Sequence, residues 1–402
     1  MPTTAPFRTR SYDFRLYAGE NALANLTGEA DRVGAKRAFV VCGRSVARGT
    51  DLIDRVQDAL KERYAGVFDG VKASSPLPSV EAGVMAAREA GADLIVALGG
   101  GSAVVTARAI IILLAEEGTA HDLSTKYPPG QTPVSPRLMA PKVPNVLVLT
   151  TPTTAMNRAG TAVMDMETHH RLELFDPKTR PSAIIWDNDA LLTAPASLYL
   201  SASASAFSGV ATGVATSNPN PIAHGDRLQA LRLMLDNIPK LDTDQDGGDV
   251  RLQLAAAAFL SNRASDVESS GGGGGFGIIS ALAHTVDTLY EDCSHGAAYS
   301  ITTPPGLRFN IAQTVAGQAR LAAALGADAD DGGEESLAHA AAERVESFYR
   351  SVGMPLRLRD VGVPQSDLTR IAEDAQKDFY LHRNPRPVQG GADLIRLLEG
   401  MW

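Results

Sequence analysis

The sequence contains little cysteine and no cluster of basic residues. Its 402 residues include two cysteines, Cys42 and Cys293. Two thiols are too few for a disulfide framework or a thiolate metal site, and they fit a reducing cytoplasm. The formal net charge is −9, which makes nucleic acid and anionic membranes poor partners. We therefore expect a cytoplasmic protein that binds neither nucleic acid nor membrane.

Long apolar segments are also missing. The apolar run at residues 107–115 is far too short to cross a bilayer. Residues 1–20 contain no apolar segment of the kind found in signal peptides, so we expect none. Hydrophobic residues still make up 44% of the chain, which is ample for burial. A chain of 402 residues is too long for one ordinary core and predicts two domains.

Residues 93–110 have the layout of a phosphate-binding turn. A short apolar run, Leu94–Leu98, predicts a buried strand, and Gly99, Gly100, Gly101 and Ser102 follow it directly. An apolar stretch with helical spacing comes next. A strand, a glycine turn and a helix together bring bare backbone N–H groups against a phosphate. The alternative is a tight turn that binds no ligand.

Strands alternate with helices in the first half of the chain and disappear from the second. The alternation predicts a parallel sheet covered by helices on both faces, with ligands at the carboxyl ends of the strands. After residue 187, Ala, Leu and Arg dominate and β-branched alternation is gone. We therefore expect an α/β dinucleotide-binding domain at 1–187 and a helical catalytic domain at 188–402. The expected strands include 11–20, 37–42, 65–70, 94–98, 145–150 and 183–186.

A second strand also ends in a turn suited to a nucleotide. The apolar strand at 145–150 leads into a turn that contains Thr151, Thr153 and Thr154. Their hydroxyls could contact a phosphate or a ribose, whereas the alternative is a turn that is only bounded by proline.

Several spaced motifs resemble the iron-containing alcohol dehydrogenase family, which has a dehydroquinate synthase-like fold. They are GADLIVALGGGS, PTTA, Asn220-Pro221, His284 and His295-Gly296. The resemblance implies a Rossmann-like domain followed by an all-α domain, and a homodimer. It also implies that Gly99–Ser102 hold the pyrophosphate of a dinucleotide, and that Thr151, Thr153 and Thr154 lie along its nicotinamide half.

One branch of that family, the maleylacetate reductases, looks closer. Its members carry a C-terminal NPRP, which is present here as residues 384–387. They also typically lack an aspartate three residues after the GGGS serine, where this chain has Val105. The family's usual lysine three residues further on is replaced by Arg108, which keeps the charge.

The metal site of the family is degenerate in this chain. The family's ligands are an Asp, a His one helical turn later and two further His. The first three positions fall on Ser205, Gly209 and Ser280, and only His295 is kept. Serine and glycine cannot replace carboxylate and imidazole for a catalytic divalent ion. We expect no bound metal, and expect the vacated space to hold a small-molecule substrate.

Without a metal, another group must polarise the substrate carbonyl. His284 matches the second histidine of the family's HxxxH pattern, and it and His295 are candidate general acids. The alternative for His284 is a core histidine with no catalytic role. A dicarboxylate substrate would suit arginine, and Arg386, Arg171 and Arg158 are the candidates, although most single arginines lie on surfaces or in ion pairs.

Arg44 bears on the choice between NADPH and NADH. Many relatives have an acidic residue just after the second strand, where it binds the ribose hydroxyls. Here Gly43 and Arg44 follow that strand, so no carboxylate repels a 2′-phosphate. We expect NADPH to be tolerated or preferred.

Three functions remain open from the sequence. The leading one is a metal-independent NAD(P)H-dependent reductase similar to maleylacetate reductase, acting on a carbonyl or a conjugated alkene. The second is the same fold recruited as a lyase, isomerase or cyclase, and the third is a non-catalytic subunit that binds a dinucleotide. The glycine run at 271–275 is either a mobile loop, a close approach to a ligand or a linker.

Overall fold

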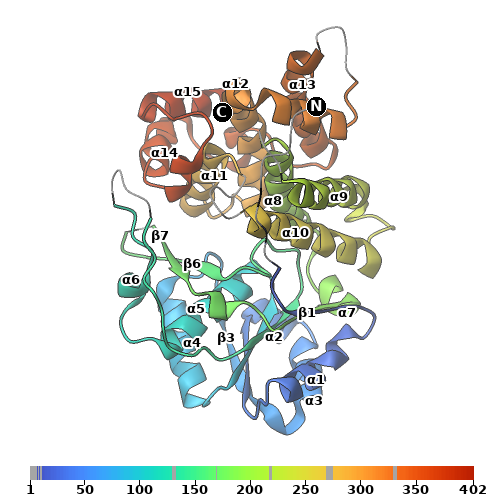
Figure 1. Cartoon of the computed structure of the whole chain (residues 1–402), viewed down its shortest axis with the longest axis vertical. Coiled ribbons are helices and arrows are strands. Elements are labelled where there is room, and N and C mark those ends of the chain that lie inside the picture. The colour runs from blue at the N-terminus through green and yellow to red at the C-terminus, as the bar shows by residue number, and fades with distance from the viewer. Residues whose placement is uncertain are drawn as a thin grey trace. The chain divides into compact units, whose positions relative to one another are not determined.

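The contacts within the chain form two compact units (Figure 1). The computed structural model describes residues 7, 9, 11–128, 133–168, 170–216, 220–268, 275–328 and 333–402. The α/β unit comprises residues 12–195 and 245–255, and the helical unit comprises 196–244, 256–402 and the described residues up to Ser11. Asp187, where the sequence places the boundary, is the last residue of a strand in the α/β unit.

A parallel sheet forms the centre of the α/β unit, which confirms the predicted fold class. Six strands lie in the order β1-β8-β5-β4-β2-β3, and every pair is parallel. These strands are β1 (Arg15–Gly19), β2 (Ala38–Gly43), β3 (Tyr64–Val71), β4 (Leu94–Gly99), β5 (Asn145–Leu149) and β8 (Ala183–Asp187). The remaining two, β6 (Gly160–Met164) and β7 (Arg171–Phe175), form a separate antiparallel pair.

Helices cover both faces of this sheet because its strands are apolar on both sides. Val40 of β2 and Val96 of β4 lie in one apolar cluster with Leu26 of α1 and Val56 of α3. On the other face, α4 and α5 contact each other and α5 contacts β4 (Figure 1). The helices of the unit are α1 (Asn25–Arg32), α2 (Arg44–Gly49), α3 (Leu52–Leu60), α4 (Leu77–Glu89), α5 (Gly101–Ala115), α6 (Ala120–Leu123) and α7 (Asn188–Leu192).

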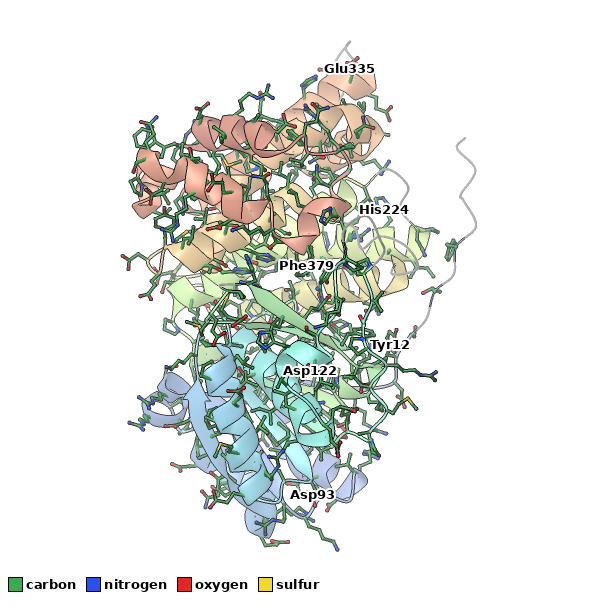
Figure 2. The ribbon with its side chains drawn as sticks, turned by 90° about the vertical axis from the view of Figure 1, so that its left-hand side faces the viewer. Tyr12, Asp93, Asp122, His224, Glu335 and Phe379 are labelled. Carbon is green, nitrogen blue, oxygen red and sulfur yellow. The ribbon has the colours of Figure 1, made fainter. Side chains whose placement is uncertain are left out.

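Asp93 marks the edge of the sheet at which β2 and β4 begin. Its carboxylate accepts hydrogen bonds from the backbone N–H groups of Lys36 and Arg37 at 2.8–3.1 Å, just before β2. Figure 2 labels Asp93 at this end of the α/β unit. The glycine turn after β4 therefore lies at the opposite, carboxyl edge, where parallel sheets bind ligands.

The helical unit consists of helices joined by turns, as the sequence predicts. Its helices are α8 (Ala196–Val214), α9 (Pro221–Asn237), α10 (Gly248–Glu268), α11 (Gly277–Leu289), α12 (His295–Ala324), α13 (Gly333–Ser351), α14 (Leu368–Ala375) and α15 (Gly391–Met401). The first residues of α10, up to Ala255, belong to the α/β unit. No helix within the described ranges is long and apolar enough to cross a membrane.

Helix α12 begins earlier than its sequence suggests. A helix is expected from Asn310, yet α12 starts at His295 and continues through Pro304 and Pro305. Proline normally ends a helix because it lacks an N–H and crowds the preceding turn. Here the helix is packed tightly at its start. An added Cβ at Gly296 would stand 2.3 Å from the backbone oxygen of Ser201 on α8, so the two backbones are in direct contact.

The carboxyl group of Asp165, in the turn after β6, is expected to make the free energy of unfolding depend on pH in acid. Hydrogen bonds from the Thr168 hydroxyl and the Glu167 N–H, together with His121, lower the pKa of Asp165 from 3.8 to about 2. Because the folded pKa lies below the unfolded one, the stabilisation is present above about pH 4 and is lost as pH falls towards 2. We expect Asp165→Asn to remove this part of the acid dependence. Urea unfolding at pH 5 and pH 3 would show it, and an unchanged difference between the two pH values would contradict it.

Candidate active site

The turn after β4 exposes the start of a helix at the carboxyl edge of the sheet. Gly99 has a φ of +139°, a conformation that side-chain-bearing residues rarely adopt, and α5 begins at Gly101. The first N–H groups of an α-helix have no acceptor within the helix, and they carry a partial positive charge. This turn has the layout of a phosphate-binding site, and the binding of a phosphate there stays a prediction.

The threonine turn after β5 lies directly against this glycine turn. Strands β4 and β5 are neighbours, and Thr150 N–H donates to the Gly99 carbonyl at 3.1 Å. An added Cβ at Gly100 would stand 2.7 Å from Thr151 Oγ1, and one at Gly101 would stand 3.0 Å from Thr153 Oγ1. Only glycine fits at Gly100 without movement of Thr151. The structure thus brings two of the predicted cofactor-binding segments together, while Thr154 follows them, half-buried.

Arg44 lies on the other side of the point where the strand order reverses. The chain runs outward from β2 to β3 and then returns to β4, which pairs with β2 on its free side. Ligands of such sheets bind in the crevice at this reversal, outside the carboxyl ends of the two strands. Arg44 is the first residue of α2, directly after β2, and its side chain is exposed. Arg44 and Gly99–Ser102 therefore flank the same reversal.

Val105 and Arg108 are the two positions of α5 that depart from the family's pattern. Both form hydrogen bonds with the segment after the threonine turn. Arg108 is fully buried, and its guanidinium donates to the backbone oxygens of Met156 at 2.7 Å and Gly160 at 3.4 Å. The backbone oxygen of Val105 accepts a hydrogen bond of 2.7 Å from Thr161. Arg108 therefore has a structural role in fixing the segment that leads away from Thr153.

In the helical unit, two helices bring together the predicted acids. Ser280 and His284 lie one turn apart on α11, and His295 is the first residue of α12. The rings of His284 and His295 are nearly parallel, with centroids 6.2 Å apart. His284 is largely buried, with 11% of its side chain exposed, whereas His295 is 45% exposed.

Sequence reasoning missed three polar residues of this cluster, Asp378, Asp287 and Tyr299. Asp378 lies 3.0 Å from His284 Nδ1, and Asp287 bonds His295 Nδ1. The Tyr299 hydroxyl lies 3.3 Å from His284 Nε2 and 3.4 Å from Ser280 Oγ. Tyr299 is four residues after His295, a helical spacing that could have been noticed if α12 had been expected to start at His295. No comparable local signal precedes the pairing with Asp378, 94 residues away from His284.

Comparison with known proteins shows to which family this chain belongs. Residues 14–188 match the family described as iron-containing alcohol dehydrogenase, and residues 206–401 match the C-terminal domain of the same family. The chain belongs to the iron-containing alcohol dehydrogenase family. The sequence resemblance is thereby confirmed.

Alignments with curated and solved relatives cover nearly the whole chain. The NAD-dependent methanol dehydrogenase of Bacillus methanolicus is 26% identical over 384 residues, which cover 94% of this chain and 96% of that protein. A 1,3-propanediol oxidoreductase structure has a TM-score of 0.86 at 22% identity, covering 99% of this chain and 100% of that one. Maleylacetate reductase from Rhizobium sp. strain MTP-10005 has a TM-score of 0.75 at 22% identity, covering 99% and 98%. These structures establish the fold, and the named relatives are oxidoreductases.

The four positions expected for the family's metal ligands, Ser205, Gly209, Ser280 and His295, carry one imidazole and no carboxylate. Ser205 and Gly209 lie one turn apart on α8, and nothing stands within 4 Å of where a Cβ at Gly209 would be. Ser280 offers a hydroxyl, and His295 alone offers an imidazole. Catalytic zinc and iron sites need about three carboxylate, imidazole or thiolate ligands. Among the residues that the structure describes, no group of three or more such side chains could hold a metal.

The three arginines proposed for a substrate carboxylate lie in different places. Arg386 is exposed, its guanidinium lies 4.1 Å from the centre of the Phe309 ring, and its Nη1 donates to the Phe309 backbone oxygen. Phe309 and Tyr299 are ten residues apart on α12, which is roughly 15 Å along a helix. Arg158 lies in the loop between the threonine turn and β6, and Arg171 begins β7. Their role in substrate binding stays a prediction.

The glycine run is the one predicted feature without a structural description. Residues 271–274 lie outside the described residues, and only Gly275 of the run is described, as part of the turn before α11. The three interpretations of the run at 271–275 therefore stay open.

Proposed function

We propose that this chain is an NAD(P)H-dependent reductase that uses no resident metal. Its substrate is a small compound with a carbonyl or a conjugated alkene, as in a maleylacetate reductase-like reaction. The observation that carries the proposal is the cluster of Ser280, His284 and His295, in which a hydroxyl and two imidazoles lie close together. Ser280 and His295 are two of the positions at which we expect the family's metal ligands. The preserved glycine turn supports the dinucleotide.

The α/β unit supplies the residues for the dinucleotide. The N–H groups at the start of α5 would hold the pyrophosphate, because glycine leaves them unobstructed. The hydroxyls of Thr151 and Thr153 border the same turn. Arg44 would pair with a 2′-phosphate and thereby favour NADPH. When bound, a reduced nicotinamide supplies the hydride for the reduction.

The helical unit supplies the proton. His284 and His295 each have Nδ1 against a carboxylate, which fixes the orientation of the ring, and Nε2 of His284 is left for proton transfer.

Cofactor titration and metal analysis of the purified protein test this proposal. We expect dihydronicotinamide fluorescence to report saturable binding of NADPH, and we expect iron and zinc well below one ion per chain. Oxidation of NADPH at 340 nm with a panel of small keto acids and enones would then identify the substrate class. Absence of binding to either dinucleotide would exclude the reductase, and a stoichiometric metal would exclude the metal-free mechanism. Binding without hydride transfer across the panel would favour the non-redox or non-catalytic alternatives.

Arg44→Glu should change the choice of cofactor. The new carboxylate would repel a 2′-phosphate and accept hydrogen bonds from ribose hydroxyls. We expect the Kd ratio of NADPH to NADH to rise by about tenfold or more, on the order of 1.4 kcal/mol. Arg88→Glu is the matched control, since Arg88 is exposed in the last turn of α4. A strong preference of the wild type for NADH, or an unchanged ratio in Arg44→Glu, would contradict the role of Arg44.

A further inference from the structure

Two helices of the helical unit aim four polar side chains at one another. Ser280 and His284 lie one turn apart on α11, and His295 and Tyr299 lie one turn apart on α12. The plane of the Tyr299 ring is steeply inclined to both imidazoles, at 79° to His284 and 71° to His295. Tyr299 is half-buried, so its ring is held while its hydroxyl stays among polar partners.

Asp378 determines which nitrogen of His284 faces Tyr299. It precedes Phe379, which Figure 2 labels in the helical unit, and its carboxylate lies 3.0 Å from His284 Nδ1. An ionised carboxylate can only accept a hydrogen bond, so Nδ1 carries the proton. The other nitrogen, Nε2, lies 3.3 Å from the Tyr299 oxygen. Asp378, His284 and Tyr299 thus form a chain of hydrogen-bonding groups.

We propose that Tyr299 is the catalytic acid of the reaction and that Ser280 is the second donor to the same substrate oxygen. The inference rests on the proposed function and names the groups that replace the metal. The two hydroxyls are 3.4 Å apart, a separation that lets both donate to one carbonyl oxygen. Two fixed donors polarise a carbonyl as an oxyanion hole does.

The proton transfer balances with His284 as the source. The carbonyl carbon accepts the hydride, and the electron pair of the C=O π bond moves to the oxygen. That oxygen takes the hydroxyl proton of Tyr299, and the Tyr299 oxygen takes the Nε2 proton of protonated His284. His284 is left neutral, with its Nδ1–H still donating to the Asp378 carboxylate, and water then returns a proton to Nε2. One carbonyl, one hydride and one proton give one alcohol.

His295 has a different part in this cluster. Its ring centroid lies 4.9 Å from that of Tyr299, and Asp287 holds its Nδ1. We assign His295 as a positioning residue that fixes the Tyr299 ring, and His284 as the relay.

Tyr299→Phe and Ser280→Ala test the assignment, with Tyr290→Phe as the matched control. Tyr290 is in the same unit and donates its hydroxyl to Asp367 at 2.7 Å, so this variant loses one tyrosine hydrogen bond outside the cluster. We expect Tyr299→Phe to lower kcat by at least about 100-fold, the usual contribution of a general acid. Ser280→Ala should lower kcat by about 10- to 100-fold, towards the loss of one oxyanion donor. Neither should change the Kd for NADPH or the melting temperature, and Tyr290→Phe should leave kcat unchanged.

Two further measurements separate a catalytic role from a structural one. The solvent deuterium isotope effect on kcat should change in Tyr299→Phe and stay at the wild-type value in Tyr290→Phe. In the cofactor-free enzyme, ¹⁵N NMR should show neutral His284 protonated on Nδ1, with its Nε2 signal shifted by Tyr299→Phe. A wild-type kcat in Tyr299→Phe would overturn the assignment while leaving the reductase intact. A wild-type enzyme that binds no dinucleotide would overturn the proposed function itself.

Discussion

Gly100→Ala is expected to abolish useful affinity for the dinucleotide. The new Cβ would stand 2.7 Å from the hydroxyl oxygen of Thr151, a separation that real contacts do not show. Thr151 is 3% exposed, so it has little room to move, and the turn before α5 must shift instead. Displaced N–H groups no longer meet the phosphate. We expect the Kd for NADPH to rise about 100-fold, or about 2.8 kcal/mol, in a fluorescence titration.

Two variants test whether this effect is steric. Gly28→Ala places a methyl group in open space on α1 of the same unit, and it should leave the Kd unchanged. The double variant Gly100→Ala/Thr151→Ala removes the hydroxyl that the new methyl meets, and it should recover part of the affinity. If the double variant binds no better than Gly100→Ala, the clash with Thr151 is not the cause.

Lys142→Met should destabilise the α/β unit by about 3–5 kcal/mol, the usual cost of breaking a buried ion pair. The Lys142 side chain is fully buried, and its ammonium lies 2.5 Å from Glu116 and 3.0 Å from Asp176. Without it, two carboxylates remain next to each other with little water. Urea unfolding followed by the fluorescence of Trp186, in a Trp402→Phe background, would report on this unit.

A neighbouring lysine provides the control for this prediction. Lys178 also pairs with Asp176 at 3.0 Å, but 42% of its side chain is exposed. Exposed ion pairs contribute little to the free energy of unfolding. Lys178→Met should therefore lower that free energy by less than about 1 kcal/mol. Equal losses in Lys142→Met and Lys178→Met would show that burial of the ammonium is not what matters.

The acid dependence of Lys142→Met gives a second check. Burial alone would raise the pKa of Asp176, but hydrogen bonds from Lys178 and Lys142 outweigh it, and the pKa is lowered. The stabilisation from a lowered pKa is present above the unfolded pKa and is lost as pH falls through the folded value. The difference between wild type and Lys142→Met should therefore be largest near neutral pH and should shrink in acid.

The sheet and its ligand-binding edge could be predicted because their signals are local. Five consecutive apolar residues before Gly99, and four before Thr150, indicate buried strands without knowledge of the rest of the chain. The rule that parallel strands end at one edge of the sheet predicts that the two turns lie near each other, but it does not predict their contact. The contact between Gly100 and Thr151 needed the structure.

The cluster around His284 was predicted only in part, for two physical reasons. The sequence predicts a helix only from Asn310, and with that start His295 and Tyr299 do not lie on a common helix. In the structure, tight packing of Gly296 on α8 holds the start of α12. Asp378 comes from a distant segment, and a pairing across 94 residues leaves no periodic signal in one sequence.

The hydrogen bonds from Arg108 to the loop before β6 have a consequence for the thermodynamics of cofactor binding. The Arg108 guanidinium holds the backbone at Met156 and Gly160 through groups of the protein itself, and the Thr161 hydroxyl donates to Val105 of α5 as well. A segment that is ordered beforehand loses little conformational entropy when a ligand arrives. Dinucleotide association in the α/β unit should therefore show a small heat-capacity change, set by the surface that the ligand itself buries and not by folding of the loop.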